Sequence, residues 1–360
     1  MSIGKTQRQA ADEAERIWRR ALAEQDQRRF EEAEHLYDRA VQLAPDDPDV
    51  HHNRGGFFKL LGRLEEAEAS LREALRLRPA APKIRHALGI VLLSQGRYAE
   101  GWPYYDARHE IPELGLPKPA VSYPEWRGED LSGKKLLIWG EQGLGDQVMF
   151  ARFAPLLQAQ GAVVTLFCHP ALSRLFDGLG VRIVPMSGQV DFPEPDYMVM
   201  SGSVAGRAGV SPSTLPRAPY LRGTVAPRGG IGVVSRGNPK HANDRNRSLP
   251  DAAAARLMTL PGAVNLLPEH TGAKDLQDTA DIIAGLDLVI TVDTSAAHVA
   301  GAMGKPVWIL LPTLMNDWRW MEGRDDSDWY PSARLYRQVE PGDWDSVLDR
   351  VERDLSTAPS

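Results

Sequence analysis

Cysteine is almost absent from this 360-residue chain, which contains only Cys168. One cysteine cannot form an internal disulfide, and no group of Cys and His has the spacing of a zinc site, so a reducing compartment is expected. No apolar run approaches the roughly 20 residues that a helix needs to cross a bilayer. Residues 1–20 lack the apolar core of a secretory signal. These absences predict a cytoplasmic protein without a membrane span.

An excess of positive charge is also lacking, because the formal net charge is −6. Without a basic excess the chain is not expected to hold a nucleic-acid backbone, so no nucleic-acid partner is predicted. Apolar residues make up 42% of the chain and charged residues 25%, which excludes a largely disordered protein. The length is enough for two or three compact units.

A repeat of 34 residues opens the chain. Phe30, Leu64 and Tyr98 begin matching segments, and Gly62 and Gly96 stand where paired helices would turn. Three more sets keep the spacing: Tyr37, Leu71 and Tyr105; Ala40 and Ala74; and Pro45 and Pro79. Small residues at helix crossings, an aromatic or Leu a turn away and a terminal Pro form the tetratricopeptide pattern. The pattern predicts three helix pairs over residues 10–110.

The third repeat departs from the pattern at Trp102-Pro103, and this proline is expected to kink the second helix or shift its start. Such stacks present a concave face to peptides or partner proteins, so a protein or peptide acceptor is expected on that face. A spacer, or a dimerisation surface that gives a homo-oligomer, is the alternative, because repeat architecture alone names no ligand.

A proline-rich linker is expected over residues 111–132, and short apolar runs alternating with helical stretches follow it. The alternation predicts parallel sheets with crossover helices, in one Rossmann-like lobe at 133–225 and a nucleotide-sugar-binding lobe at 226–340. A helix or tail is expected at 341–360. The expected strands are 135–139, 163–168, 181–184, 231–234, 263–267, 288–292 and 307–311; the expected helices are 146–158, 170–178, 251–258, 279–284 and 295–303; residues 201–230 are expected to be loop and hinge. The fold class is therefore α plus α/β.

The first chemical motif runs from Gly140 to Asp146, between a predicted strand and a predicted helix. It is no dinucleotide fingerprint, because Val148 stands where that pattern needs glycine, and no Gly-Lys-Ser/Thr of a P-loop follows. Gly143 and Gly145 would still let a substrate approach the backbone, and a helix N-terminus favours anionic groups. The alternative makes Asp146 a helix N-cap, which contributes about 1 kcal/mol.

The second motif is basic and spans residues 235–248, directly after the first strand of the second lobe. Its polar and charged side chains are Arg236, Asn238, Lys240, His241, Asn243, Asp244, Arg245 and Arg247. A solvated loop is the usual fate of such a run. At the carboxyl end of a sheet strand, however, guanidinium groups suit phosphate oxygens, and phosphate binding is predicted.

The third motif, residues 291–298, ends a predicted strand and begins a helix. Small side chains leave the backbone N–H groups of the helix accessible, which predicts an anion site. The site residues are Asp293, Thr294, Ser295 and His298. Asp293 or Thr294 as a plain N-cap, and His298 as a core histidine, are the alternatives. Trp318, Trp320, Trp329, Tyr330 and Tyr336 follow; stacking on a donor base is one interpretation, and packing of the tail across the lobes is favoured.

Taken together, the motifs resemble a known enzyme family. Gly145-Asp146, the basic loop and Asp293-Thr294-Ser295-x-x-His298 resemble the ADP-heptose glycosyltransferases of family 9. The strings from Trp139 to Asp146, Gly237 to Ser248 and Asp317 to Trp320 are similar to bacterial proteins that fuse tetratricopeptide repeats to such a region. The plan is similar to that of the protein O-linked N-acetylglucosamine transferases.

The resemblance implies a GT-B-like pair of lobes and inverting, metal-independent transfer from a nucleotide sugar, which is a substrate rather than a cofactor. It implies that Asp146 is the catalytic base and that Gln142, Gly143 and Gly145 form an acceptor-side loop. The donor site that it implies comprises Arg236, Asn238, Lys240, Arg245, Arg247, Asp293, Thr294, Ser295 and His298. The lobes are smaller than is usual for the family, and the connector before Ile231 is short. A repeat adaptor with a degenerate, non-catalytic transferase region is therefore the alternative function.

Overall fold

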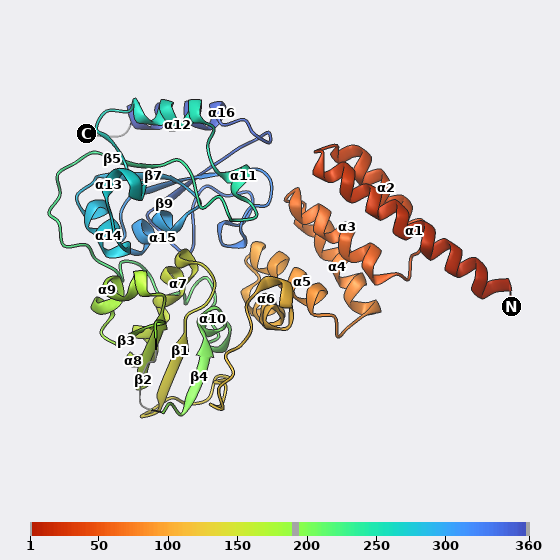
Figure 1. Ribbon diagram of the computed structural model, residues 1–360, viewed down its shortest axis with the longest axis horizontal. Coiled ribbons are helices and arrows are strands. Elements are labelled where there is room, and N and C mark those ends of the chain that lie inside the picture. Colours follow the sequence, from red (N-terminus) through yellow and green to blue (C-terminus); the bar gives the residue numbers. More distant parts are fainter. Residues whose placement is uncertain (1, 189–193, 358–360) are drawn as a thin grey trace. The chain divides into compact units, whose positions relative to one another are not determined.

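The computed structural model describes residues 2–188 and 194–357 and divides the chain into two compact units (Figure 1). The first unit comprises Met1–Pro117 together with Leu314–Glu322, and the second comprises Lys118–Thr313 and Gly323–Ser360. In the described residues no helix is both long and apolar enough to cross a membrane.

The first unit consists of antiparallel helix pairs, which confirms the predicted tetratricopeptide repeats. Its helices are α1 (Ser2–Asp26), α2 (Phe30–Leu43), α3 (Pro48–Leu60), α4 (Leu64–Leu77), α5 (Pro82–Ser94) and α6 (Tyr98–Tyr105), followed by the 3₁₀ turns η1 (Asp106–Glu110) and η2 (Pro112–Leu114). Within each pair, α1 packs on α2, α3 on α4 and α5 on α6. Gly62 and Gly96 lie in the turns with φ of 72° and 74°, a conformation that glycine adopts without strain.

Glycine at the helix crossings sets how closely the paired helices approach. A Cβ atom at Gly55 would lie 2.6 Å from Cγ of Leu71, and one at Gly89 would lie 2.7 Å from the main-chain N of Tyr105. The second of these contacts repeats the first 34 residues further along the chain. Any larger residue at these two positions would force the helices apart, so the repeat pattern has a direct steric cause.

Consecutive repeats are joined by ion pairs that keep the same period. Arg63 binds Glu34 with Nη1 to Oε2 at 2.6 Å, and Arg97 binds Glu68 at 2.6 Å. In the third repeat the equivalent position is Trp102, whose ring lies 5.4 Å from that of Trp318. Trp318 belongs to η6 (Trp318–Trp320), in the segment Leu314–Glu322. That segment therefore covers the helix that has no further repeat to pack against.

The last repeat helix contains Pro103 and is short; its start at Tyr98 keeps the repeat spacing, so the predicted shift of its start was wrong. Helix α6 has 8 residues, whereas α2 and α4 each have 14, and the chain continues from α6 into the 3₁₀ turn η1. Proline cannot donate the hydrogen bond that a longer helix would need at this position.

The second unit contains two parallel sheets, which confirms the predicted α/β fold class. The first sheet has the order β3-β2-β1-β4 and the second has the order β6-β5-β7-β8-β9. The strands are β1 (Lys135–Trp139), β2 (Val163–Cys168), β3 (Arg182–Pro185), β4 (Tyr197–Met200), β5 (Ile231–Val234), β6 (Ala263–Asn265), β7 (Leu288–Val292), β8 (Val307–Leu311) and β9 (Ala333–Arg337).

Helices cover the sheets of this unit. They are α7 (Leu144–Ala151), α8 (Phe153–Ala159), α9 (Ser173–Phe176), α10 (Val204–Arg207), α11 (Asp244–Arg247), α12 (Asp251–Met258), α13 (Pro268–Thr271), α14 (Leu276–Ala284), α15 (Ser295–Ala302) and α16 (Asp345–Thr357). Figure 1 shows α12 and α16 on one side of the second sheet and α14 and α15 on the other.

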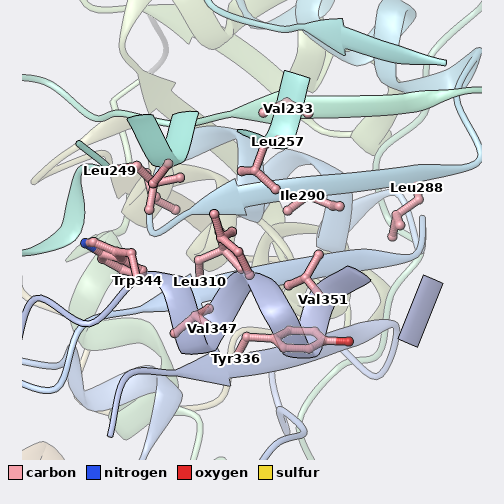
Figure 2. Close-up of a cluster of buried hydrophobic side chains, with 13 residues drawn as sticks. Val233, Leu249, Leu257, Leu288, Ile290, Leu310, Tyr336, Trp344, Val347 and Val351 are labelled. Carbon is pink, nitrogen blue, oxygen red and sulfur yellow. The ribbon is translucent and has the colours of Figure 1, made fainter. Parts of the chain in front are cut away.

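The core under α12 and α16 fixes the register of the second sheet. Figure 2 shows Leu257 from α12 and Val347 and Val351 from α16 directed at Ile290 of β7 and Leu310 of β8. Each of these five side chains is at most 1% exposed. Parallel strands that are covered on both faces carry continuous apolar runs, which is why β7 and β8 were predicted with their full bounds.

Several expected elements were wrong in detail. The predicted helix over residues 146–158 is two helices, α7 and α8, separated at Arg152. The predicted helix over 170–178 is a series of short turns, and the predicted loop at 201–230 contains the turn η5 (Ser201–Ser203) and α10. Strands β4 and β9 were missed. Residues 189–193 and 358–360, which fall in the predicted first lobe and tail, lie outside the described residues.

Arg152 stands at the break between α7 and α8. Its side chain is 1% exposed, and its nitrogen atoms donate to the main-chain oxygens of Met149, Pro216 and Trp329 at 2.9, 3.1 and 2.9 Å. A buried cation must have its donors satisfied, and carbonyl oxygens satisfy them here. The same contacts join the first sheet's helix layer to the segment before β9.

Candidate functional site

The loop between β1 and α7 is held by its own polar side chains. Gln142 adopts a left-handed conformation with φ of 63°, and Gly143 precedes the first residue of α7. Oδ2 of Asp146 accepts a hydrogen bond from the N–H of Gly143 at 2.9 Å. Asp146 is therefore the third residue of the helix rather than its N-cap, and its carboxylate binds back to the N-cap residue Gly143. The simple N-cap interpretation was wrong in position.

Two side chains that were not singled out from the sequence fix this loop to the sheet. Glu141 is 7% exposed, and its Oε1 accepts from the N–H of Gly202 at 2.9 Å. Oε1 of Gln147 accepts from the N–H of His169 at 2.9 Å, and a Cβ at Gly140 would lie 2.8 Å from that same oxygen. A polar residue in or just after a glycine-rich turn is the sequence signal that points to such side chains, since buried polar groups need hydrogen-bond partners.

Helix α15 begins where the fully buried strand β7 ends. Thr294 is its N-cap residue, but it makes no side-chain hydrogen bond to the helix; its Oγ1 lies 3.1 Å from Oγ1 of Thr291. His298, one turn into the helix, is 3% exposed, and its Nδ1 lies 2.9 Å from the hydroxyl of Tyr330. A helix N-terminus without a side-chain cap favours an anion.

The first turns of α7 and α15 meet directly. A Cβ at Gly145 would lie 2.5 Å from Cδ2 and 3.2 Å from Nε2 of His298, so only glycine allows this approach. The two helices make one of the larger helix–helix contacts of the unit. The structure therefore brings together Gly145, next to the predicted base Asp146, and His298 of the predicted donor site.

The basic loop is joined to the start of α15 by Arg247. This residue is buried, and its Nη1 donates to the main-chain oxygen of Asp293 at 2.7 Å. Nε of Arg247 lies 3.3 Å from Oδ1 of Asp244, and a Cβ at Gly237 would lie 2.4 Å from Nη2 of Arg247. Arg247 is thus built into the fold, and the alternative of a wholly solvated loop was wrong at this residue.

The other cations of the loop differ in their surroundings. Arg236 forms an ion pair with Glu269. Hydrogen bonding to the main chain at Glu269, and the guanidinium of Arg236, hold the pKa of the Glu269 carboxyl below its usual range. Lys240 and Arg245 are exposed, and within the described part of the chain neither side chain has a recorded protein partner. These two are the basic groups best able to move onto an anion.

The remaining loop residues shape the backbone. Oδ1 of Asn238 accepts from the N–H of Lys240 at 3.0 Å, and Nδ1 of His241 accepts from the N–H of Asn243 at 3.2 Å. Such side-chain-to-backbone bonds hold polar loops in a defined turn.

The C-terminal aromatic residues are core residues. Trp320, Trp329 and Tyr330 are 0% exposed, and the hydroxyl of Tyr336 donates to Asp354 of α16 at 2.8 Å. Burial leaves no ring face on which a base could stack. Stacking on a donor base was therefore wrong. The aromatics do pack in the core, but Trp318 and Trp320 pack in the first unit rather than across the lobes as predicted. In residues 2–188 and 194–357 no group of three or more His, Cys, Asp or Glu side chains is arranged to hold a metal ion.

Comparisons with known proteins agree with both parts of the chain. The tetratricopeptide repeat family model matches residues 19–82 and 60–108, and that of glycosyltransferase family 9 (heptosyltransferase) matches residues 232–312. The predicted repeats and family 9 region are thus confirmed. The second match includes the basic loop and α15 but not α7, which carries Asp146. The similarity to O-linked N-acetylglucosamine transferases is not shown and stays a prediction.

Protein FlbA of Caulobacter vibrioides is 28% identical over 376 aligned residues, which cover 88% of this chain and 62% of FlbA. The chain thus spans less than two thirds of this relative's length. Among solved structures, the repeat domain of Arabidopsis OM64 is 20% identical with a TM-score of 0.27, covering 29% of this chain and 87% of that one. The Sgt2 repeat domain from Aspergillus fumigatus is 22% identical with a TM-score of 0.26, covering 27% and 65%.

Proposed function

We propose that this protein is an inverting, metal-independent glycosyltransferase that moves a sugar from a nucleotide-sugar donor to a protein or another polar acceptor. The observation that carries the proposal is the contact between Gly145 and His298, because it sets the first turn of α7 beside the first turn of α15. Open α/β proteins bind their ligands beyond the carboxyl ends of the strands, where both helices begin. The family 9 match over residues 232–312 supports the same class of reaction.

The donor diphosphate would bind at the start of α15. Its uncapped N–H groups and the positive end of the helix dipole favour an anion. Lys240 and Arg245 supply exposed positive charge from the neighbouring loop, and Arg247 holds that loop against Asp293. Protein cations and N–H groups then neutralise the leaving diphosphate, which is the role that a divalent metal has in other transferases.

Asp146 would act as the base on the other side of the reaction. The acceptor hydroxyl loses its proton to the Asp146 carboxylate while its oxygen forms a bond to the anomeric carbon. The bond from that carbon to the diphosphate oxygen breaks with the electron pair leaving on the nucleotide. Attack opposite the leaving group inverts the anomeric centre. General-base help of this kind typically contributes 10²–10⁴-fold in rate.

The repeat unit supports the proposed class of acceptor, and the free thiol of Cys168 supports the proposed cellular compartment. We assign recognition of a protein or peptide acceptor to the tetratricopeptide repeats, because stacked helix pairs present extended surfaces to such ligands. Cys168 is buried, and burial raises the pKa of its thiol to about 12, so it stays protonated. We propose a cytoplasmic setting, in keeping with a free cysteine.

Titration calorimetry of the full chain with UDP, GDP and ADP tests the proposal. At least one nucleotide is expected to bind, with an affinity that is unchanged by EDTA. Strict dependence on magnesium or manganese would contradict the metal-independent donor site. Failure of all three to bind would favour the alternative, a repeat adaptor with a non-catalytic transferase region, because an adaptor needs no nucleotide.

A further inference from the structure

Tyr330 is the polar partner of His298 inside the core. Its side chain is 0% exposed, and its hydroxyl lies 2.9 Å from Nδ1 of the imidazole. From the sequence, Tyr330 was considered only for aromatic packing or for stacking on a donor base. A hydrogen bond between two buried side chains is seldom accidental, because each group would otherwise lose its partner in water.

The ring of Tyr330 is fixed from two sides. A Cβ at Gly301 would lie 2.4 Å from Cγ of Tyr330, so the ring fits against the bare backbone of α15. On another side, the guanidinium carbon of Arg152 lies 5.0 Å from the ring centroid, and Arg152 itself is held by three main-chain oxygens. The hydroxyl therefore has little freedom to leave Nδ1.

We propose that Tyr330 is a positioning residue for His298: its hydroxyl donates to Nδ1 and so holds the neutral imidazole as the Nε2–H tautomer. Nε2–H, the ring nitrogen on the side of Gly145, then donates a hydrogen bond to an anionic oxygen of the donor diphosphate. This inference rests on the proposed function, since it gives the ligand of the same site. The bond made by one nitrogen of a histidine decides which proton the other can offer.

Charged groups also lie on the elements packed against α15. On the side of α7 they are Asp146, whose carboxylate accepts from Gly143, and the cation Arg152. On α14 they are Asp278, paired with Arg174 at 3.0 Å, and Asp281, which accepts from Thr224. Strands β7 and β8 carry no charged residue. These acidic groups already have partners.

Nucleotide affinity and the tautomer of His298 together separate orientation from packing. We would measure, by calorimetry on the full chain, the affinity of the nucleoside diphosphate that binds best among UDP, GDP and ADP. Tyr330→Phe is expected to weaken binding on the order of tenfold, the loss of about one hydrogen bond.

Two variants calibrate this measurement. His298→Ala should weaken binding at least as much. Tyr336→Phe removes another buried hydroxyl of the same unit, one bound to Asp354, and should leave affinity unchanged. A deficit of Tyr330→Phe without any change in the His298 tautomer would mean that Tyr330 only fills space, and no deficit at all would remove it from the site. Either result overturns the inference.

Nitrogen NMR of the free protein tests the tautomer without any nucleotide. The wild type should show the proton of His298 on Nε2, and Tyr330→Phe should show a mixture of tautomers. A proton on Nδ1 in the wild type would overturn the inference even if nucleotide binds. The expected tautomer, with no binding of any of the three nucleotides, would instead contradict the proposed function.

Discussion

The main chain of Gly145 lies directly against the imidazole of His298, so closely that a Cβ at residue 145 would be 2.5 Å from Cδ2 of the ring. The ring cannot move away easily, because it is 3% exposed and bound to Tyr330. This contact makes the fold and the candidate site depend on the same glycine.

Gly145→Ala is therefore expected to destabilise the protein by about 1–3 kcal/mol, as overpacking in a filled core does. It should also weaken nucleotide binding, since His298 must shift. Thermal unfolding and calorimetry measure the two effects. Gly178→Ala is the control, because a Cβ there meets nothing within 4 Å. A Gly145→Ala protein with wild-type stability and affinity would contradict the close approach.

Arg245 and Arg247 should separate ligand binding from folding. Arg247→Ala removes the bond to the Asp293 carbonyl, so it should lower the melting temperature and weaken nucleotide binding by roughly 1.5–3 kcal/mol, as for a charge-assisted hydrogen bond. Arg245 is exposed, so Arg245→Ala should weaken binding while leaving the melting temperature unchanged. If both variants bound nucleotide like the wild type, the basic loop would not contact the donor.

A partly buried histidine of the repeat unit, His86, should make stability depend on pH. Burial lowers the pKa of His86 to about 4, and the positive charges of Lys59, Arg108 and His109 act in the same direction. In the unfolded chain the imidazole takes up a proton below about pH 6.5, whereas in the folded chain it stays neutral down to about pH 4. Stability is thus fully present above the unfolded pKa and is lost as the pH falls from there towards 4, by roughly 3 kcal/mol from this group.

The check is the free energy of unfolding at several pH values in that window, for wild type and for His86→Gln. Glutamine does not titrate, so the variant should lose less stability than the wild type between about pH 6.5 and 4. Parallel curves for the two proteins would show that another group causes the acid sensitivity.

Trp318 should stabilise the end of the repeat stack. Its ring is 5.4 Å from that of Trp102 and 6.0 Å from that of Tyr105, and it is 4% exposed. Trp318→Ala is expected to cost about 3–5 kcal/mol, in the range of buried aromatic truncations. Hydrogen exchange should rise in α5 and α6. Leu114→Ala, at a residue that is 42% exposed, is the control. Unchanged exchange in α6 would contradict this role.

Elements could be predicted from the sequence where their pattern lies within one short stretch of the chain. The 34-residue period was recognised from residues such as Phe30, Leu64 and Tyr98, and two of the helix crossings are close because Gly55 and Gly89 have no side chain. Strands β1, β2, β5, β7 and β8 were predicted with their full bounds because a strand covered on both faces is a continuous apolar run. Strand β4 was missed although it is a short apolar run, and strand β9 was missed because Arg334 and Arg337 interrupt its apolar residues.

The site was only partly accessible to the same reasoning. The helix start at Thr294 was located from the end of a strand and the small residues after it, whereas the start at Gly143 was placed three residues too late, at Asp146. The roles of Arg247 and Tyr330 could not be predicted, because each depends on a single contact across the fold, with Asp293 and with His298. The proline in α6 indicated a disturbed helix, but nothing in the repeat pattern predicted that Trp318 would pack on Trp102 of this helix.

The last prediction concerns Asp146. Its carboxylate accepts the N–H of Gly143 at 2.9 Å, so it contributes to the helix start, and the proposed function also makes it the base. Asparagine separates the two roles. Its side-chain oxygen can accept the same N–H, so Asp146→Asn should keep its melting temperature and nucleotide affinity close to those of the wild type. An amide cannot accept the acceptor's proton, so turnover should fall at least about a hundredfold.

Asp146→Ala provides the matched comparison, because it loses both the hydrogen bond and the base. It should unfold at a lower temperature than Asp146→Asn, by an amount that reflects about 1 kcal/mol, and transfer sugar no faster. The rates are to be measured at saturating donor, so that any change in affinity does not enter. Near wild-type transfer by Asp146→Asn would leave this carboxylate a structural group of the loop, and the base would have to be another residue.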